Sequence, residues 1–375
     1  GHKDFDVSVD PFMDPKDAAS RRDFTINSLF YDFQNDSIVD FFGGLDDLRD
    51  GVIRMTSEST FQDDPLRVLR AMQLVARKAK TVHPDTIRAA RGMEIDSLPK
   101  ERVMAEWVKL LLESDRPSVG LTFLLECGWL RFFPELREFA AWSGWDYPEN
   151  AEFVSTERGC PQNPEWHPEG NVWVHTLFVL DAAAKQREEV DAEWKLAFMF
   201  AALLHDVAKP TTTLLPECTA HGHEAAGGPL ARKFMERLTN NATLINRVAA
   251  LVVNHLQPHF LKEARPSRWK RLQGKVERLD VLGHLTIADW CGRAGRSPEE
   301  KCNVGTTAMC FEWHGNLGKD GDKVVPVVTG HDLIAAGFAP GSHFKAALNA
   351  AFNAQLDDPS LGKDALLVEA VTLLK

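Results

Sequence analysis

The feature that most constrains the fold of this chain is a helical spacing of apolar residues through most of its length. From residue 60 onward, apolar side chains recur every three to four positions, as on one face of an α-helix. Strand-like character is confined to short pieces such as residues 5–9 and 38–42. The predicted fold class is therefore mainly α, with a remnant of a small α/β unit near the start.

Residues 20–29, which read S-R-R-D-F-T-I-N-S-L, gather polar side chains around an apolar turn. Arg21 and Arg22 offer forked, charged donors that suit phosphate oxygens. Asp23 and Asn27 are one helical turn apart and could reach ribose hydroxyls or a metal-bound phosphate from one face. An Arg-Asp cluster that caps a helix explains these residues about equally well. The stretch alone therefore permits a nucleotide-binding site without requiring one.

The same stretch closely resembles the R-R-D-F-T-I-N-A-L signature of bacterial tRNA nucleotidyltransferases and poly(A) polymerases. Residues 40–54 continue the resemblance to the family's D-x-x-G-G-x-x-D-L-x-x-G-x-x-R segment, and residues 63–67 resemble its E-D-x-x-R motif. The resemblance implies that Asp64 and Arg67 select the incoming base from ATP and CTP, with a tRNA or other RNA 3′ end as acceptor. Without the neighbouring motifs, this pair would be interpreted as a surface ion pair. The resemblance leaves open whether CCA, A alone or a poly(A) tail is added.

Two further elements of the family bear on this interpretation. Arg102 and Glu106, four residues apart, are expected to brace the helix that carries the base-selecting pair. The family also uses a Gly-Gly-x-x-Arg-Asp turn and an Asp-x-Asp pair to hold Mg²⁺ for nucleotidyl transfer. No such segment precedes Ser20, and Asp4-Phe5-Asp6 lacks the glycine turn. We therefore expect a part of a longer protein, with the Mg²⁺ ligands missing from this chain.

A second group of candidate residues is rich in histidine. Residues 196–204 are almost unbroken apolar and end in His205-Asp206, which predicts a buried helix that delivers an imidazole and a carboxylate. A buried carboxylate needs a cation or strong donors. His175 and Asp289 lie in two other apolar stretches. In this order, the four residues resemble the H…HD…D signature of HD-domain phosphohydrolases, which implies a divalent transition metal, with manganese, cobalt, nickel or iron suiting the ligands.

Additional candidates surround these four. His223 and His255 lie between the His-Asp doublet and Asp289, where some HD proteins supply ligands for a second metal. His221 and His223 could also converge on one ion, donate to phosphate or lie at a loop surface. Lys209 is the candidate contact to substrate phosphate, although Ala208 replaces the glycine usual in the family. A satisfied buried His-Asp pair is the structural alternative for the core residues.

The resemblance implies an enzyme that builds or repairs tRNA 3′ ends and hydrolyses phosphoesters at its HD site. A bound metal would activate water for attack on a 2′,3′-cyclic phosphate or a 2′-phosphate of RNA. One alternative is a stand-alone HD phosphohydrolase or phosphodiesterase that uses the truncated nucleotide-binding part only to grip RNA. Another is a non-catalytic RNA-binding protein.

Composition is typical of a soluble, cytoplasmic protein. The sequence contains no apolar run of membrane length, no signal-peptide pattern and six cysteines without paired spacing. A formal net charge of −11 argues against broad nucleic-acid affinity, yet residues 265–278 are locally basic around Trp269. That segment could hold an RNA backbone and stack on a base, or form a solvated helix face. The oligomeric state is not predicted.

The motifs and composition predict five consecutive parts. They are a remnant of the nucleotidyltransferase head at 1–43, a helical neck and body at 44–145, a linker at 146–165, a helical HD domain at 166–300 and a helical tail at 301–375.

Overall fold

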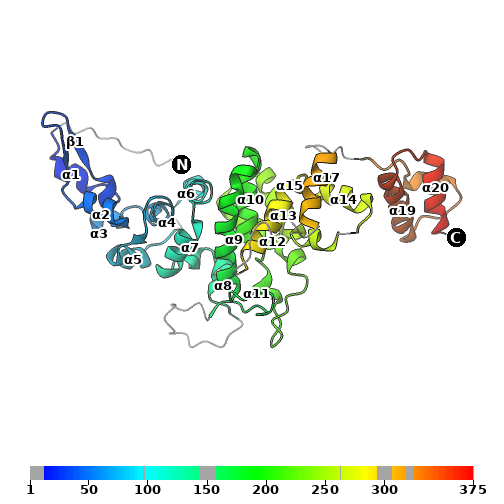
Figure 1. The fold of residues 1–375 in the computed structure, drawn as a ribbon, viewed down its shortest axis with the longest axis horizontal. Helices are drawn as coiled ribbons and strands as arrows, with labels where there is room; N and C mark the ends of the chain where they lie inside the picture. Colours follow the sequence, from blue (N-terminus) through cyan, green and yellow to red (C-terminus); the bar gives the residue numbers. More distant parts are fainter. Residues whose placement is uncertain are drawn as a thin grey trace.

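The chain forms an elongated row of helices in which successive parts of the sequence follow one another along the long axis (Figure 1). The computed structural model describes residues 12–95, 98–143, 158–261, 263–293, 306–317 and 324–374. The prediction of a mainly α fold is confirmed. The strand predicted at residues 5–9 and the Asp4-Phe5-Asp6 sequence lie outside the described residues.

The β structure is confined to two small pairs of strands. Strand β1 (Phe30–Asp32) pairs antiparallel with β2 (Ser37–Val39), and β3 (Val52–Ile53) pairs parallel with β4 (Thr81–Val82). The strand expected at 38–42 ends at Val39 because the Asp40 carboxylate accepts hydrogen bonds from the amides of residues 42, 44 and 45 at 2.9–3.1 Å. Asp40 thereby turns the chain into the next helix.

Two glycines make that turn possible. Gly43 has a φ of +76°, a conformation that favours glycine. A Cβ on Gly44 would lie 2.2 Å from the carbonyl oxygen of Thr25, so only glycine allows the first turn of α2 (Gly44–Asp50) to approach the motif that begins at Ser20. The motif itself consists of the end of α1 (Pro15–Ser20), an extended segment and a short 3-10 helix, Thr25–Asn27.

A helical unit follows, with its apolar faces turned inward. Helix α4 packs on α6 and α7, and its buried face includes Leu69 and Met72. Fully buried Trp107 of α6 contacts the ring of Phe133 edge-on, with centroids 5.2 Å apart. The helices of this unit are α3 (Glu58–Gln62), α4 (Leu66–Lys78), α5 (Pro84–Arg91), α6 (Lys100–Glu113), α7 (Pro117–Glu126) and α8 (Pro134–Ala140).

The histidine-rich part forms the middle of the row, around the predicted buried helix. That helix, α10 (Ala192–Leu204), is confirmed and is buried along its whole second half. It packs on α9, α13 and α15, which places the ends of several helices close to His205. The surrounding helices are α9 (Val172–Gln186), α11 (Lys209–Thr212), α12 (His223–Leu238), α13 (Ala242–Asn254), α14 (Pro266–Val276), α15 (Leu279–Cys291) and α17 (Thr306–Leu317).

The tail has a small core of its own, as expected for a compact helical end. Helices α18 (Gly330–Ala335), α19 (His343–Asp357) and α20 (Lys363–Thr372) bury Leu333 and Leu366 between them. Helix α14 contacts α19, and the Lys270 ammonium donates to the Leu356 carbonyl oxygen at 2.6 Å.

The basic segment 265–278 is used in part inside the protein, whereas Arg265, Arg268 and Lys275 are exposed. Trp269 is fully buried and stacks on Trp313, with ring centroids 6.2 Å apart. The alternative in which Trp269 stacks on an RNA base is wrong for this structure, because no face of the indole is open. Arg271 donates to Asn353 of α19 at 2.6 Å, so this basic face helps to hold the tail.

The large core is continuous across the first two helical units. Buried apolar residues between Phe24 and Cys310 form one connected cluster, so contacts alone do not mark a boundary there, and the five-part division stays a prediction. Among the described residues, no helix is long and apolar enough to cross a membrane.

Candidate metal centre and nucleotide-binding site

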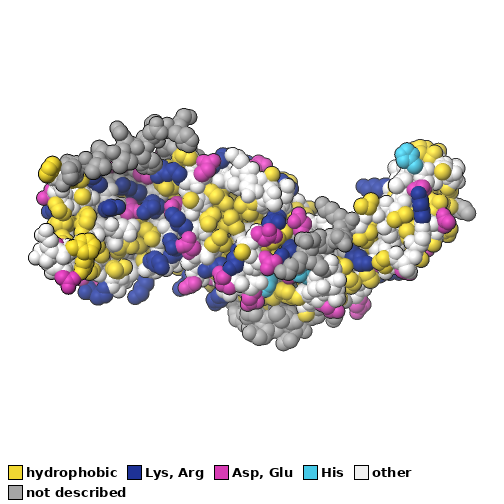
Figure 2. All heavy atoms as spheres, turned by 90° about the horizontal axis from the view of Figure 1, so that it is seen from above, with side chains coloured by type: hydrophobic (Ala, Val, Ile, Leu, Met, Phe, Trp, Pro, Cys, Tyr) yellow, Lys and Arg dark blue, Asp and Glu magenta, His cyan; other side chains and the backbone are white. Residues whose placement is uncertain are grey.

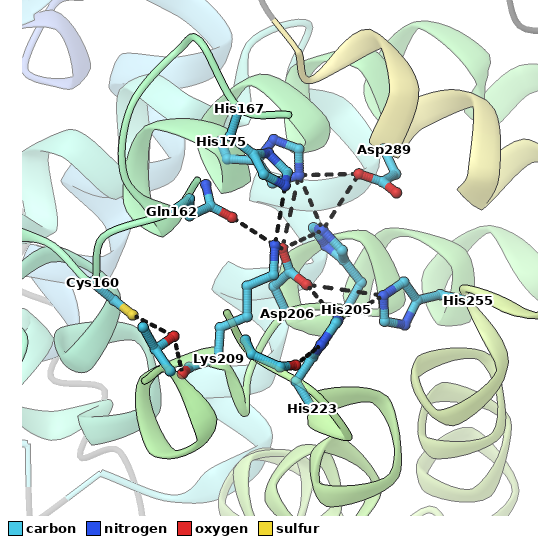
Figure 3. A network of polar contacts seen from close by, with 12 residues as sticks. Cys160, Gln162, His167, His175, His205, Asp206, Lys209, His223, His255 and Asp289 are labelled. Carbon is cyan, nitrogen blue, oxygen red and sulfur yellow. Dashed lines mark hydrogen bonds and ion pairs between the residues drawn. The ribbon is translucent and has the colours of Figure 1, made fainter. Parts of the chain in front are cut away.

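The four residues of the predicted HD signature come together between α9, α10 and α15 (Figure 3). His175 Nε2 lies 3.1 Å from Asp289 Oδ1 and 3.3 Å from His205 Nε2. Asp206, directly after His205, places Oδ2 3.1 Å from His205 Nε2. All four side chains are buried. His175, His205 and Asp289 offer ligand atoms close enough together for one metal ion.

A second group of possible ligands shares Asp206 with the first. His223 Nε2 lies 3.2 Å from Asp206 Oδ1, and His255 Nε2 lies 3.9 Å from the same oxygen. These three buried residues could also hold an ion. His223 begins α12 and His255 directly follows α13, and these two helices pack on each other more extensively than any other pair of elements that the structure describes. His221 is exposed and its ring does not join this group.

The second ring nitrogen of each histidine determines its tautomer. Nδ1 of His205, His223 and His255 lies 2.7–2.9 Å from the carbonyl oxygen of the residue three positions earlier. A carbonyl only accepts, so each Nδ1 must carry a proton. Nε2 then presents a lone pair to the site in the neutral ring, or donates to a neighbouring acceptor such as Asp206 in the protonated ring.

This tautomer assignment places unprotonated Nε2 atoms of neutral histidines next to one another. The Nε2 atoms of His205 and His175 face one another at 3.3 Å, and those of His223 and His255 at 3.4 Å. Two lone pairs repel at such distances, so each pair needs a proton or a metal cation between them. Imidazole and carboxylate donors are the set that divalent transition metals prefer, so the residues present fit a metal centre.

The cluster shifts the pKa values of its carboxylates and its histidines in different directions. Burial alone would raise the pKa of Asp206, but the charges of His205 and Lys209 and hydrogen bonds from His205 and His223 hold it well below its usual range. Burial, aided by the charge of His205, lowers the pKa of His255 to about 3. Burial also acts on His175 and His223, but hydrogen bonds to Asp289 and Asp206 raise the pKa of these two rings, so metal binding competes with protons there.

Lys209 lies inside the centre. Its ammonium contacts Asp206 Oδ2 at 2.8 Å and donates to Gln162 Oε1 at 2.6 Å. In this structure Lys209 is therefore the counter-ion of Asp206, and its predicted contact with substrate phosphate stays a prediction. Sequence reasoning missed Gln162, which falls in the expected linker.

Glu169 is a second residue that sequence reasoning missed. Its fully buried side chain accepts from His175 Nδ1 at 2.7 Å and from His167 Nδ1 at 2.9 Å. Burial opposes its ionisation, yet these two hydrogen bonds lower the pKa of Glu169 to about 2. Glu169 thus orients His175, as carboxylates commonly do behind metal-binding histidines. The sequence does contain a signal for Glu169, because His-Pro-Glu-Gly places a carboxylate just before the helix that carries His175.

A pocket of about 350 Å³ opens onto the centre. Asp206, Asp289, His223 and His255 contribute to its floor, and the loop after Cys160 forms part of its wall. The second half of the predicted linker is therefore part of the site.

The N-terminal motif forms a separate group around Asp23. This buried carboxylate accepts from Asn27 Nδ2 at 2.9 Å and from Arg70 Nε at 2.6 Å. Both carboxylate oxygens of Asp23 thus accept hydrogen bonds within the protein, and these bonds hold the side chains of Arg70 and Asn27 in position. Arg21 and Arg22 are exposed. Their role in binding nucleotides stays a prediction.

The base-selecting pair lies beside this group at the start of α4. Arg67 donates to the backbone carbonyl oxygen of Arg21 at 3.1 Å, which links α4 to the motif. Asp64 does not pair with Arg67; its Oδ2 accepts from Arg102 at 2.8 Å. Arg102 thus contacts Asp64 directly, whereas Glu106 pairs with Lys109. Figure 2 shows Lys and Arg side chains gathered over the N-terminal half of the face in view.

Three family models match the chain in the order of these parts. They are the poly A polymerase head domain at residues 3–54, the probable RNA and SrmB-binding site of polymerase A at 81–139 and the HD domain at 172–293.

Curated relatives cover more of the chain. The multifunctional CCA protein of Nitrosospira multiformis is 33% identical over 307 residues, covering 79% of this chain and 68% of the relative. That of Laribacter hongkongensis is 34% identical over 312 residues, covering 80% and 70%. A solved Thermotoga maritima CCA-adding enzyme in complex with tRNA aligns over 96% of this chain and 74% of that chain, at 17% identity and a TM-score of 0.47, a likeness too low to add an argument. On the curated matches and the domain order, the chain belongs to the multifunctional CCA protein family, the tRNA nucleotidyltransferases that carry an HD domain.

Proposed function

We propose that this chain takes part in adding and repairing CCA at tRNA 3′ ends, using CTP and ATP, and that its HD centre is a metal-dependent phosphohydrolase. Membership of the multifunctional CCA protein family supports the first activity. The proposed nucleotide-binding residues of the chain are Arg21, Arg22, Asp23, Asn27, Asp64 and Arg67. Mg²⁺ is the proposed cofactor of nucleotidyl transfer, and a cytoplasmic location belongs to the same proposal.

One observation carries the second activity: two pairs of histidine Nε2 atoms face one another around Asp206. The proposed ligands are His175, His205, Asp206 and Asp289, with His223 and His255 completing a second position on Asp206. Manganese, cobalt, nickel and iron suit this mixture of imidazole and carboxylate. When bound, such a metal lowers the pKa of a coordinated water and polarises a phosphoryl oxygen.

The residues of the chain supply the remaining requirements. Glu169 holds the proton on His175 Nδ1 and so keeps Nε2 directed into the centre. Lys209 holds a positive charge beside Asp206 and is the proposed donor to a phosphate oxygen. A 2′,3′-cyclic phosphate or a 2′-phosphate at an RNA end is the proposed substrate. The similarity to curated multifunctional CCA proteins does not favour the two alternatives, a stand-alone hydrolase and a non-catalytic RNA-binding protein.

The test of the hydrolase combines metal analysis with an activity assay. We expect stoichiometric transition metal in the purified chain, and hydrolysis of 2′,3′-cyclic AMP that His205→Ala abolishes together with the metal. His331→Ala, which alters an exposed histidine in α18, is the control and should change neither. A protein that stays metal-free and inactive with manganese, cobalt, nickel and iron would refute the hydrolase.

The nucleotide site is tested separately by calorimetric titration with ATP and CTP. We expect Arg67→Ala to weaken binding of both. Arg88→Ala, which changes an exposed arginine of α5, is the control. Equal losses in both variants would attribute binding to net charge and refute the assignment of Arg67.

A further inference from the structure

Trp166 is the most exposed of the tryptophans that the structure describes. Its surface is 58% exposed, whereas Trp107, Trp129 and Trp173 are at most 2% exposed. An indole left in water forgoes the stabilisation that burial would provide, and tryptophan is enriched at interfaces because it combines a large apolar face with a polar N–H. Trp166 belongs to the loop that forms one wall of the pocket above the metal centre.

The loop holds Trp166 in place through backbone contacts. The Trp166 amide donates to the Asn163 carbonyl oxygen at 3.2 Å, and the His167 amide donates to the same oxygen at 2.9 Å. The Asn163 side chain accepts from the amide of Glu165 at 2.9 Å. The next side chain, His167, is tied to Glu169 behind the centre. A wall that is already ordered loses little conformational entropy when a ligand binds.

The pocket is larger than a phosphate group requires. Its volume of about 350 Å³ falls in the range of sites for small organic molecules, about 300–1,000 Å³. Charged side chains line it: Lys209 lies 2.8 Å from Asp206, and Asp289 and Arg293 belong to the same lining. The exposed indole of Trp166 lines this pocket as well.

We propose that Trp166 stacks on the base of the nucleotide whose phosphate enters the HD centre. The site then prefers a terminal nucleotide of RNA, or a mononucleotide, over phosphoesters without a base. This inference rests on the proposed hydrolase and adds a residue that selects its substrate class. Stacking on an aromatic ring tolerates any base, so the preference extends to all nucleotides that reach the pocket.

The test is calorimetric binding to manganese-loaded protein, with two phosphorothioates as hydrolysis-resistant ligands. Adenosine 2′-phosphorothioate carries a base, and glycerol 2-phosphorothioate does not. We expect Trp166→Ala to weaken binding of the adenosine ligand about 5- to 150-fold and to leave the glycerol ligand within about twofold. Trp166→Phe should retain most of the affinity. Phe178→Ala removes a half-exposed ring of α9 outside this pocket and should change neither ligand.

Three outcomes would overturn the proposal. Equal losses for both ligands would make Trp166 a structural support of the loop. No loss for either would make it a surface residue without contact to the ligand, as expected if it contacts another protein. If wild-type protein binds neither ligand, the phosphoester site itself is refuted, so failure of the inference and failure of the proposed hydrolase are distinguishable. Because Trp166 is exposed, thermal unfolding of the variants should match that of wild type.

Discussion

Lys209 is the counter-ion of Asp206, and replacing it tests the electrostatic account of the centre. The two charged atoms are 2.8 Å apart, and the side chains are only 11% and 2% exposed. With an effective dielectric constant of about 20, their attraction is about 6 kcal/mol. Burial of the ammonium offsets part of that attraction, and removal of one partner from a buried pair costs about 3–5 kcal/mol. We expect Lys209→Met to lower the free energy of unfolding of the metal-free protein by that amount.

A bound divalent metal should reverse most of this loss, because it replaces the missing positive charge beside Asp206. A ligand present at 100 times its Kd stabilises the folded state by about 2.7 kcal/mol. Without the neighbouring ammonium the metal binds more tightly, so the gain at equal free manganese should be larger in Lys209→Met than in wild type. Urea unfolding followed by circular dichroism, with EDTA and with manganese, measures both quantities.

The control is Lys195→Met, which removes a lysine from the same domain. Lys195 pairs with Glu188, whose side chain is 73% exposed, so its loss should cost at most about 1 kcal/mol and should not depend on metal. If Lys209→Met is no more destabilising than this control, or if manganese stabilises both variants equally, the counter-ion account is wrong.

Three further predictions concern other parts of the chain. Gly120→Ala should lower the free energy of unfolding by about 1–3 kcal/mol, because the added Cβ would lie 2.6 Å from a leucine methyl group and from a backbone carbonyl oxygen. Gly274→Ala, in open space on a helix, should raise it by about 0.5–1 kcal/mol. Chemical denaturation that ranks the two variants the other way would contradict this packing. Arg102→Ala should change stability by at most about 1 kcal/mol, since both partners of its ion pair are about one-third exposed, but should weaken ATP binding by releasing Asp64; unchanged calorimetric affinity would argue against the brace. The pKa of Asp332 is lowered to about 2 by hydrogen bonds from Lys363 of α20 and from Thr329, the N-cap of α18. The contribution of these hydrogen bonds to folding stability is therefore complete above about pH 4 and is lost as the pH falls toward 2. An NMR titration midpoint at or above 3.8 would refute this.

The helical fold and the HD residues were accessible from sequence for physical reasons. Helix α10 is recognisable because a run of apolar residues of that length has to be buried. The buried polar pair His205-Asp206 at its end would lower the stability of the fold unless a partner or a bound cation compensates, so it points to a functional site. The motif order carried the family assignment. The strand expected at 38–42 was too long because the Asp40 side chain competes for the amides that a strand would use.

Other features depended on contacts that no local pattern encodes. Glu169 and Gln162 lie in a Pro-rich, polar stretch that has the composition of a linker, and only the folded chain brings them to His175 and Lys209. The basic segment around Trp269 has the composition of an RNA-binding segment, but packing against Trp313 removes Trp269 from solvent. Residue type sets which interactions a side chain can make, and its burial in the folded chain decides which of those interactions are possible with a ligand.

By itself, the sequence determined the kinds of ligand, their order and the helices that carry them, because residue type sets donor chemistry and apolar spacing sets secondary structure. Only the tertiary structure decided which atoms meet. His175 and Asp289 are 114 positions apart, yet their side chains are 3.1 Å apart because α9 and α15 pack against each other. The ends of α10, α12 and α13 bring three more histidines to the same place, so that Nε2 atoms face one another at 3.3 and 3.4 Å. Neutral rings so placed repel each other unless a cation lies between them, and that is the physical reason to place a metal there.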